Sequence, residues 1–243
     1  MKEKQFKKIL KKGVNQIDLP VTEQQLQNFW VYYNFLKQEN NKYNLTGIIT
    51  PREVIYKHFL DSLVFAQHFS LNNYKKVLDI GSGAGFPGIV LKIMFPHLNF
   101  ILIDSRLKRI NFLKRLSHKL AIGEVKIKCI HGRAEVLAHQ KEYREEFSLV
   151  VARAVAPLNV LAEYALGFVR PGGRFVAYKG INYQQELNKA RKAIDILGGK
   201  ISQIISLKVP GITEKRFLLV IEKIIAISRH YPRKTGKPKK APL

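Results

Sequence analysis

A glycine-rich segment at residues 77–88, VLDIGSGAGFPG, is where residue types and spacing first indicate a ligand site. Gly81, Gly83, Gly85 and Gly88 lie within eight positions, directly after an apolar run. Glycine has no Cβ and tolerates positive φ, so a backbone of this composition can approach a bound molecule closely. The segment therefore predicts a loop that holds a nucleotide-derived ligand.

The glycine spacing fits two kinds of ligand. Gly83, Gly85 and Gly88 form the GxGxxG pattern that is associated with dinucleotide pyrophosphates. Gly81, Gly83 and Gly85 instead form a GxGxG cluster behind Asp79. The glycines alone leave both interpretations open.

Two carboxylates bear on the choice. Asp104 ends the apolar run NFILID, and an acid at that position accepts hydrogen bonds from both hydroxyls of a ribose. NAD and S-adenosylmethionine both contain that ribose. Asp79 precedes the loop, where a negative charge disfavours a pyrophosphate and suits the ammonium or sulfonium end of a methionine moiety. Nothing downstream resembles a second nucleotide-binding half, so the residues favour S-adenosylmethionine as the cofactor.

The elements that must position these residues follow from the hydrophobic pattern. From residue 75 onward, short β-branched runs alternate with helical patterns, which predicts right-handed crossovers and a parallel sheet with helices on both faces. The runs at 201–209 and 215–224 are joined by the turn-rich PGITE and predict a closing antiparallel hairpin. The expected fold class is α/β, a doubly wound, mostly parallel, Rossmann-like sheet. The glycine loop then lies at the carboxyl end of the first strand, where open α/β sheets bind ligands.

The charge of the chain indicates a polyanionic partner. The formal net charge is +24, from 42 Lys and Arg against 18 Asp and Glu. Residues 1–12 and 229–243 are strongly basic and predict basic arms at both ends. Residues 105–120, SRLKRINFLKRLSHKL, predict a helix with one apolar and one cationic face. RNA or DNA is the expected partner.

Other sequence features limit the setting in which the protein works. Lysines interrupt the apolar positions of the N-terminus, so no signal peptide or transmembrane helix is visible. The single cysteine, Cys129, excludes an internal disulfide and a thiolate metal cluster. We expect a cytoplasmic protein with no membrane partner and no metal.

Several motifs together carry a family resemblance. VLDIGSGAGFPG followed by ILIDS resembles the first two motifs of class I S-adenosylmethionine-dependent methyltransferases. A longer ordered set is similar to the bacterial small-subunit (16S) ribosomal RNA methyltransferase G family, also called glucose-inhibited division protein B, and spans nearly the whole chain. The set consists of NLTGI at 44–48, HFLDSL at 58–63, GSGAGFPGI at 81–89, GRAE at 132–135, ARA at 152–154 and YKG at 178–180.

The resemblance implies methyl transfer to N7 of a guanine in 16S ribosomal RNA, with S-adenosylmethionine as the cofactor. The implied partner is small-subunit ribosomal RNA, the small ribosomal subunit or an assembly intermediate. Family roles place Gly81, Phe86, Ala134, Glu135 and Arg153 in the cofactor site. The physical interpretation adds Asp79, Gly83, Gly85 and Asp104.

The expected domain organisation follows from the change of hydrophobic pattern along the chain. Residues 1–70 read as mostly helical, and Thr22 followed by Gln25 predicts a capping box at the start of a helix. We expect residues 1–70 to form an N-terminal helical extension, residues 71–226 the methyltransferase domain, and residues 227–243 a basic C-terminal tail.

The residues after the fourth predicted strand limit the type of reaction. The sequence ARAVAP offers neither the cysteine nucleophile of cytosine C5 methylation nor the Asn-Pro-Pro-aromatic type of segment associated with exocyclic amines. Guanine N7 presents an in-plane lone pair and no proton, so its methylation requires positioning rather than a general base. No catalytic residue is therefore predicted.

Some assignments stay open at this point. Phe86 also fits a packing role between helix and core, and Arg153 also fits an ion pair with Asp104 or Glu135. Arg153 and Lys179 are expected to hold phosphate or the cofactor carboxylate rather than to touch N7. The roles of His58 and Asp61 are undetermined, although the match to HFLDSL implies substrate contact. The alternative functions are methylation of another RNA, an NAD-dependent oxidoreductase and a non-catalytic RNA-binding protein.

Overall fold

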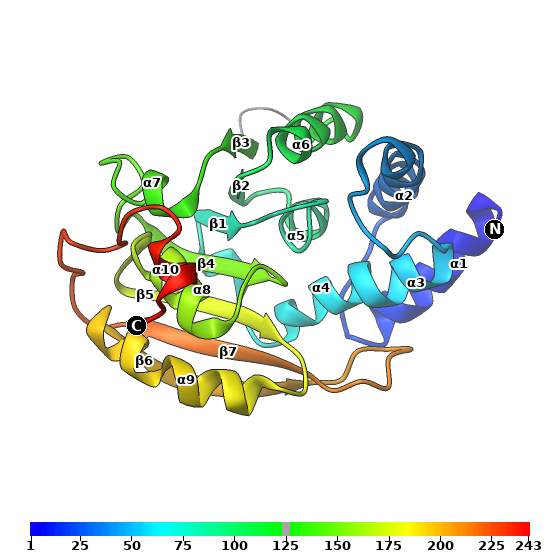
Figure 1. Ribbon diagram of the computed structural model, residues 1–243. Helices are drawn as coiled ribbons and strands as arrows, with labels where there is room; N and C mark the ends of the chain where they lie inside the picture. The colour runs from blue at the N-terminus through cyan, green and yellow to red at the C-terminus, as the bar shows by residue number, and fades with distance from the viewer. Residues whose placement is uncertain (123–126) are drawn as a thin grey trace.

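The computed structural model describes residues 1–122 and 127–243, and within them a seven-stranded sheet has helices on both faces (Figure 1). The strands are β1 (Lys76–Ile80), β2 (Asn99–Asp104), β3 (Ile127–His131), β4 (Phe147–Arg153), β5 (Val169–Lys179), β6 (Gly199–Leu207) and β7 (Arg216–Lys223). Their order is β3-β2-β1-β4-β5-β7-β6. The first five strands in this order are parallel, and β7 is antiparallel to both of its neighbours. The predicted fold class, including the closing antiparallel hairpin, is confirmed. The run EVKIKCI at 124–130 also predicts a strand, of which β3 covers residues 127–130, and residues 124–126 lie outside the described residues.

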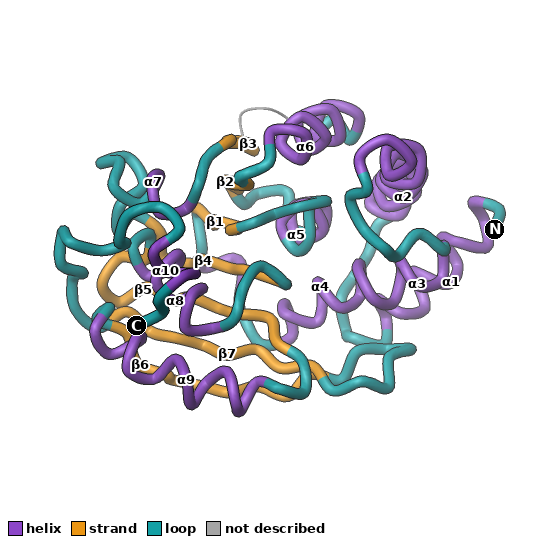
Figure 2. The backbone as a smooth tube through the Cα atoms, viewed as in Figure 1, coloured by secondary structure: helices purple, strands orange, loops and turns teal. Residues whose placement is uncertain are grey.

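Alternate side chains of the sheet enter two separate cores, as the period of two in a strand requires. Val77 and Phe100 face one core with α1 (Glu3–Asn15), α2 (Glu23–Tyr43), α5 (Gly88–Met94) and α6 (Leu107–Lys119). Leu78 and Ile101 face the other with α7 (Ala134–Leu137), α8 (Leu158–Leu166) and α9 (Tyr183–Ile196). Because helices cover both faces, the central strands β1, β2 and β4 are buried along nearly their whole length rather than at alternate residues. Figure 2 shows the strands as a layer between these helices.

The N-terminal helices pack beside the first core and lead into β1. After α2, the chain forms short consecutive helices: α3 (Pro51–Glu53), the π-helix η1 (Val54–Leu60), α4 (Asp61–Leu63), and the 3-10 helices η2 (Val64–Gln67) and η3 (Leu71–Asn73). The capping box of Thr22 and Gln25 is present at the start of α2. The prediction of a basic arm at the N-terminus is wrong. α1 buries Phe6, Leu10 and Val14 completely, so this segment is held by an apolar helix face with lysines on the outside.

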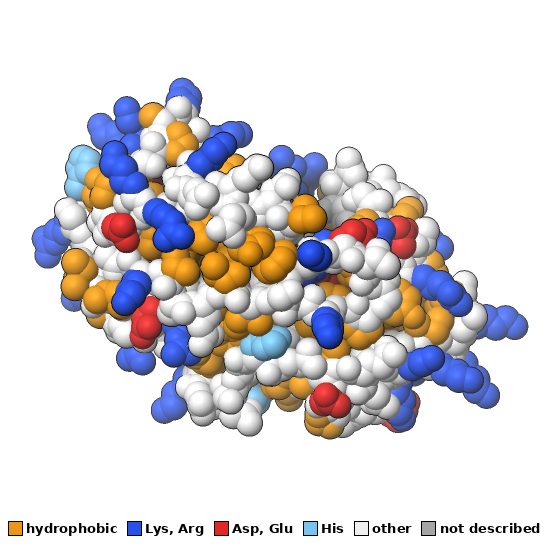
Figure 3. Space-filling model, turned by 90° about the horizontal axis from the view of Figure 1, so that it is seen from below, with side chains coloured by type: hydrophobic (Ala, Val, Ile, Leu, Met, Phe, Trp, Pro, Cys, Tyr) orange, Lys and Arg blue, Asp and Glu red, His pale blue; other side chains and the backbone are white. Residues whose placement is uncertain are grey.

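The surface is dominated by cations. On the face shown in Figure 3, Lys and Arg side chains outnumber Asp and Glu and gather toward its two ends. Among the described residues, the structure contains no helix that is both long enough and apolar enough to cross a bilayer.

Candidate active site

The glycine loop leaves the carboxyl end of β1 and is tied to the tip of β2. The N–H groups of Gly81 and Ser82 both donate to the carbonyl oxygen of Ile103, at 2.8 and 3.0 Å. Gly81 has φ +66° and Gly83 has φ +57°, values that side chains with a Cβ rarely adopt. A Cβ on Gly81 would also lie 2.6 Å from a methyl group of Val155. Both the backbone angle and the packing therefore require glycine at Gly81, and the backbone angle favours it at Gly83.

Asp104 lies at the end of β2, and its carboxylate is fixed in place. Its Oδ2 accepts from the Gly83 N–H at 3.0 Å and its Oδ1 from the Arg106 N–H at 2.9 Å. Arg109, from the first turn of α6, approaches Oδ2 at 3.3 Å and balances the charge. Asp104 is only 3% exposed, and it is one of the residues that line a cavity at this edge of the sheet. An acceptor held in this way is preorganised for a diol.

The cavity that Asp104 lines has a volume of about 570 Å³, and we refer to it as the first cavity. It lies at the carboxyl ends of the parallel strands β1, β2 and β4, where such folds bind nucleotides. The structure brings four of the predicted cofactor residues to its wall: Gly81, Asp104, Ala134 and Glu135. Gly83 is beside it, and a Cβ built there would meet no heavy atom closer than 3.7 Å. The remaining predicted residues, Asp79, Gly85, Phe86 and Arg153, do not line the first cavity.

Asp79 lies beneath the glycine loop rather than facing the cavity. Its Oδ2 accepts from the Gly88 N–H at 3.0 Å, and its Oδ1 has no hydrogen-bond partner among the described residues. Burial raises the pKa of Asp79 to about 7. A Cβ on Gly88 would lie 2.5 Å from Leu102 and 2.6 Å from Asp79, so Gly88 is required for packing of α5 on the sheet. Asp79 thus shapes the loop from below, and the structure places it out of direct reach of the cavity.

Gly85 and Phe86 form the junction between the loop and the N-terminal helices. Gly85 has φ +100°, and a Cβ there would lie 2.7 Å from the hydroxyl of Tyr32. The Phe86 ring stacks on His58 with 4.2 Å between ring centroids and on Tyr32 with 5.5 Å. Packing, the second of the two roles expected for Phe86, is therefore what the contacts show.

Arg153, at the end of β4, connects the sheet to the N-terminal helices. Its guanidinium donates to the carbonyl oxygens of Lys57 and His58, at 2.9 and 3.3 Å, and to Ser62 Oγ at 3.2 Å. Its Nη1 forms an ion pair with Asp61 Oδ2 at 2.8 Å. The partner of Arg153 is therefore Asp61 and not Asp104 or Glu135, because the HFLDSL segment rather than the cofactor loop packs against the end of β4.

The same contacts of Arg153 influence the pKa of His58. Arg153 Nη2 lies 2.8 Å from His58 Nδ1, which also lies 3.1 Å from the Lys57 carbonyl oxygen, and His58 Nε2 lies 3.0 Å from Thr46 Oγ1. Burial, assisted by the charge of Arg153, lowers the pKa of His58 to about 3. His58 is therefore a neutral structural residue at physiological pH.

A pH dependence of stability follows from this histidine. Its folded pKa of about 3 lies below the reference value of 6.5, so its stabilising contribution is complete above pH 6.5 and is lost as pH falls toward 3. Relative to the variant His58→Asn, we expect the free energy of unfolding of the wild type to decrease by about 2 kcal/mol between pH 7.5 and pH 5.

Urea unfolding at both pH values measures this difference. Comparison with the variant is needed because Asp79, whose pKa is raised, contributes with the opposite sign. The exposed His118→Asn serves as the control. A wild-type-minus-variant difference that stays constant with pH would contradict the assignment.

A second cavity of about 560 Å³ adjoins the first. Ala154 and Val155, directly after β4, line both cavities and so form a common wall. Ala154 has φ +55°, a left-handed conformation that turns the chain sharply at this wall. Ala156 follows this wall, and its carbonyl oxygen accepts a hydrogen bond from Lys179 at 2.9 Å. Lys179 also donates to Glu186 at 2.6 Å. Lys179 is thus held by groups of the chain itself, in contrast to the expected role of holding phosphate or the cofactor carboxylate.

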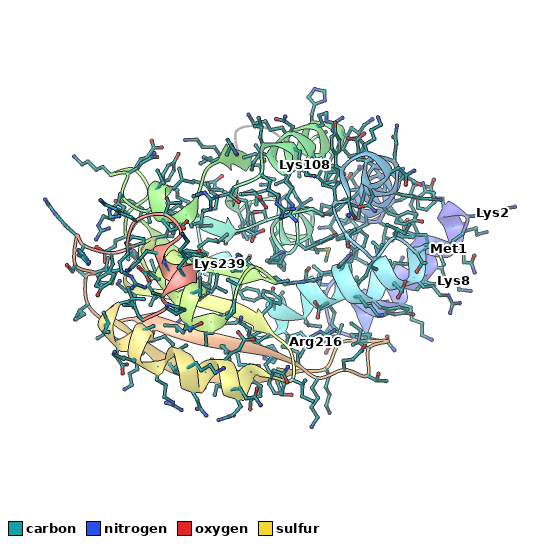
Figure 4. All side chains as sticks on the ribbon, in the orientation of Figure 1. Met1, Lys2, Lys8, Lys108, Arg216 and Lys239 are labelled. Carbon is teal, nitrogen blue, oxygen red and sulfur yellow. The ribbon has the colours of Figure 1, made fainter. Side chains whose placement is uncertain are left out.

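The C-terminal segment is not a free arm either. Arg233 forms a bidentate pair with Glu163 of α8, at 2.7 and 2.9 Å, and Glu163 is completely buried. The Gly236 N–H donates to Glu135 at 3.2 Å, which places α10 (Lys237–Lys240) beside the first cavity. Lys239, labelled in Figure 4, is one of the residues that line that cavity. The prediction of a C-terminal arm is therefore wrong, because buried polar partners on α7 and α8 hold the segment.

Sequence reasoning missed three features of this region. They are the pairing of Arg109 with Asp104, the pairing of Arg233 with Glu163, and the place of Lys239 at the first cavity. One signal was present. Glu163 is the single acid of the apolar run LNVLAEYAL, and an acid in the buried face of a helix requires a cationic partner. The sequence alone does not identify which Lys or Arg is the partner of Glu163.

The sequence is similar to those of known proteins along most of its length. The model of the family described as rRNA small subunit methyltransferase G matches residues 25–217. The chain is 43% identical over 239 residues to Ribosomal RNA small subunit methyltransferase G of Alkaliphilus oremlandii, covering 98% of this chain and 99% of that protein. The protein of the same name from Brevibacillus brevis is 43% identical over 244 residues and is covered completely, as is this chain.

Solved structures agree at the level of the fold. A SAM dependent methyltransferase from Aquifex aeolicus superposes with a TM-score of 0.53 at 13% identity, covering 72% of this chain and 94% of that chain.

Proposed function

Because the chain belongs to the rRNA small subunit methyltransferase G family, we propose that it transfers a methyl group from S-adenosylmethionine to N7 of a guanine in 16S ribosomal RNA. The substrate is small-subunit ribosomal RNA, alone or within the subunit or an assembly intermediate, and the setting is the bacterial cytoplasm. The observation that carries the proposal is the pair of adjoining cavities. One has a diol acceptor, Asp104, and the other shares its wall at Ala154 and Val155.

The residues of the first cavity fit the cofactor. The space over Gly83, which a Cβ would otherwise enter, lets a ligand approach the loop backbone, and Asp104 presents a fixed acceptor beside it. We propose that Gly81, Gly83, Asp104, Ala134 and Glu135 contact the cofactor. Asp79, Gly85, Phe86 and Arg153 contribute by positioning these contacts. When bound, S-adenosylmethionine supplies an electrophilic methyl group on a sulfonium.

The chain's own contribution to the reaction is positioning. Guanine N7 has no proton to lose, so no general base is needed, and alignment of the reacting atoms accounts for the acceleration. The purine becomes cationic during transfer, and a free cation beside it would oppose the reaction. Arg153 and Lys179 meet this requirement because each is paired with a carboxylate and donates hydrogen bonds to carbonyl oxygens of the chain.

The RNA-binding part of the proposal rests on the distribution of cations. On α6, Lys108 and Lys114 are exposed, and Figure 4 shows Lys108 on this helix at the surface. Arg109 and Arg115 pair with acids of the chain instead, so only part of the cationic face expected on this helix is free for phosphates. Exposed lysines of α1 and α10 add to it. Such surfaces bind nucleic acid with a strong dependence on salt.

The alternative functions have less support. In an oxidoreductase the GxGxxG would end at Gly88 with its backbone near a pyrophosphate, whereas Gly88 is packed on Leu102 and Asp79. A purely RNA-binding protein would not require a buried carboxylate fixed at the edge of a cavity. Methylation of another RNA is separated from the proposal only by experiment.

The direct test maps 7-methylguanine in 16S ribosomal RNA from cells with and without the protein. Borohydride reduction followed by aniline cleaves the RNA at such positions. We expect one cleavage site to disappear with the protein and to return when purified enzyme and S-adenosylmethionine are added. An identical cleavage pattern in both RNAs would refute the proposal.

A further inference from the structure

In the wall of the second cavity, Asp61 has a fully covered carboxylate oxygen whose hydrogen-bonding capacity is unused. Asp61 lines this cavity and is 5% exposed. Its Oδ2 is paired with Arg153 at 2.8 Å, whereas its Oδ1 has no hydrogen-bond partner among the described residues. Arg216, at the start of β7, reaches Oδ1 only as an ion pair at 3.4 Å. A buried polar atom without a donor costs stability, so an acceptor kept in this state is suited to a ligand that supplies the donor.

The other polar groups of this cavity are already satisfied. Glu186 accepts from Lys179 and from the Leu158 N–H, at 2.6 and 2.8 Å. The Tyr178 hydroxyl donates to the Ser62 carbonyl oxygen at 3.1 Å. Asp61 is therefore the acid in this cavity that has capacity left for a substrate. The common wall of the two cavities places that capacity beside the cofactor site.

We propose that Asp61 recognises the Watson–Crick edge of the substrate guanine, accepting hydrogen bonds from N1–H and from the N2 amino group. This inference rests on the proposed function. Guanine presents two adjacent donors on that edge, which match the two oxygens of a carboxylate, whereas adenine presents an acceptor at N1 and is repelled. Arg216, at the start of β7 (Figure 4), lines the cavity and its side chain is 29% exposed, so this long side chain can turn toward an RNA phosphate when the base enters.

The same contact would favour the transition state. Methylation at N7 places positive charge on the purine and makes N1–H more acidic. A hydrogen bond from N1–H to a carboxylate therefore strengthens as the new C–N bond forms and the sulfonium loses its charge. An interaction that is stronger in the transition state than in the ground state accelerates the reaction. Asp61 would then serve both specificity and rate without accepting a proton.

The test compares two RNAs that differ by one amino group. After the methylated guanine is mapped, small-subunit particles are assembled from ligated RNA that carries guanosine or inosine at that position. Inosine retains N7 and N1–H but lacks the N2 amino group. We expect the wild type to prefer guanosine by about 10- to 100-fold in kcat/KM, because inosine loses one of the two hydrogen bonds to a charged acceptor. In Asp61→Asn the preference should fall close to the intrinsic reactivity ratio of the two purines, because an amide cannot accept from both donors.

Controls separate recognition from folding. Asp195→Asn, an exposed acid on α9, should keep the wild-type preference. The guanosine-to-inosine ratio of Asp61→Asn is taken at saturating S-adenosylmethionine, because Asp61 also pairs with Arg153. Should Asp61→Asn fail to fold, the wild type alone decides, because equal rates on the two RNAs overturn the inference. An undiminished guanosine preference in Asp61→Asn also overturns it. Absence of any methyl transfer to guanine N7 by the wild type would instead overturn the proposed function.

Discussion

Asp104→Ala should weaken S-adenosylmethionine binding by an order of magnitude or more while RNA binding stays unchanged. A buried acceptor that makes charge-assisted hydrogen bonds contributes about 1.5–3 kcal/mol. The structure adds a second reason, since the same carboxylate fixes the loop through the Gly83 N–H and neutralises Arg109. The variant therefore loses the diol acceptor and leaves a cation beside the cofactor.

Isothermal titration calorimetry with S-adenosylmethionine measures the dissociation constant, and filter binding measures RNA affinity. Asp195→Ala removes the same charge from an exposed position on α9 and should leave both affinities unchanged. An unchanged dissociation constant in Asp104→Ala would remove this residue from the cofactor site. A parallel loss of RNA affinity would mean that the carboxylate supports the fold rather than the ligand.

Arg233→Ala should destabilise the protein by about 3–5 kcal/mol, because it leaves a buried carboxylate without its partner. Glu163 is completely buried and depends on Arg233 for three hydrogen bonds from the guanidinium, and its Oε1 also accepts from the Arg233 N–H. Replacing both members with Arg233→Ala and Glu163→Leu should recover much of this loss, since an apolar pair needs no solvation. Urea unfolding of the three proteins measures the free energies.

The exposed Arg229→Ala is the matched control, because it removes one positive charge from the same segment without a buried partner. If the segment were an arm that only contacts RNA, both single variants would unfold like the wild type and would weaken RNA binding equally. The basic segment is still expected to support RNA binding, with a flatter salt dependence when its charges are removed. Neutralising the exposed Lys234, Lys237 and Lys240 tests this without disturbing Glu163.

The sheet and the cofactor loop were predictable because their signals are local. β-branched runs alternate with helical periods from residue 75, and this pattern alone implies parallel strands with helices on both faces. Gly81, Gly83 and Gly85 have positive φ, as a tight loop at the tip of β1 requires. Asp104 reaches that loop because β1 and β2 are adjacent and parallel in register, which the strand–helix–strand pattern also implied.

The two ends were mispredicted because charge dominated their composition. Lysines in α1 conceal the apolar positions Phe6, Leu10 and Val14, whose spacing is helical. In the C-terminal segment, the polar groups that hold it lie 70 residues or more away along the chain, as with Arg233 on Glu163 and Gly236 on Glu135. The hydrophobic periodicity of a segment cannot indicate a contact between residues so far apart in the sequence.

By itself, the sequence determined the alternation of strands and helices along the chain from residue 75. It also determined the place of the glycine loop and Asp104, and the family through its ordered motifs. Only the tertiary structure decided which cations are free, because Arg109, Arg153, Lys179 and Arg233 look like ligand-binding residues until their internal partners are seen. It also placed Asp61 in the cavity beside the cofactor site. The physical reason is that elements form from neighbours in sequence, whereas a charge is satisfied by whichever group folding brings within a few ångströms.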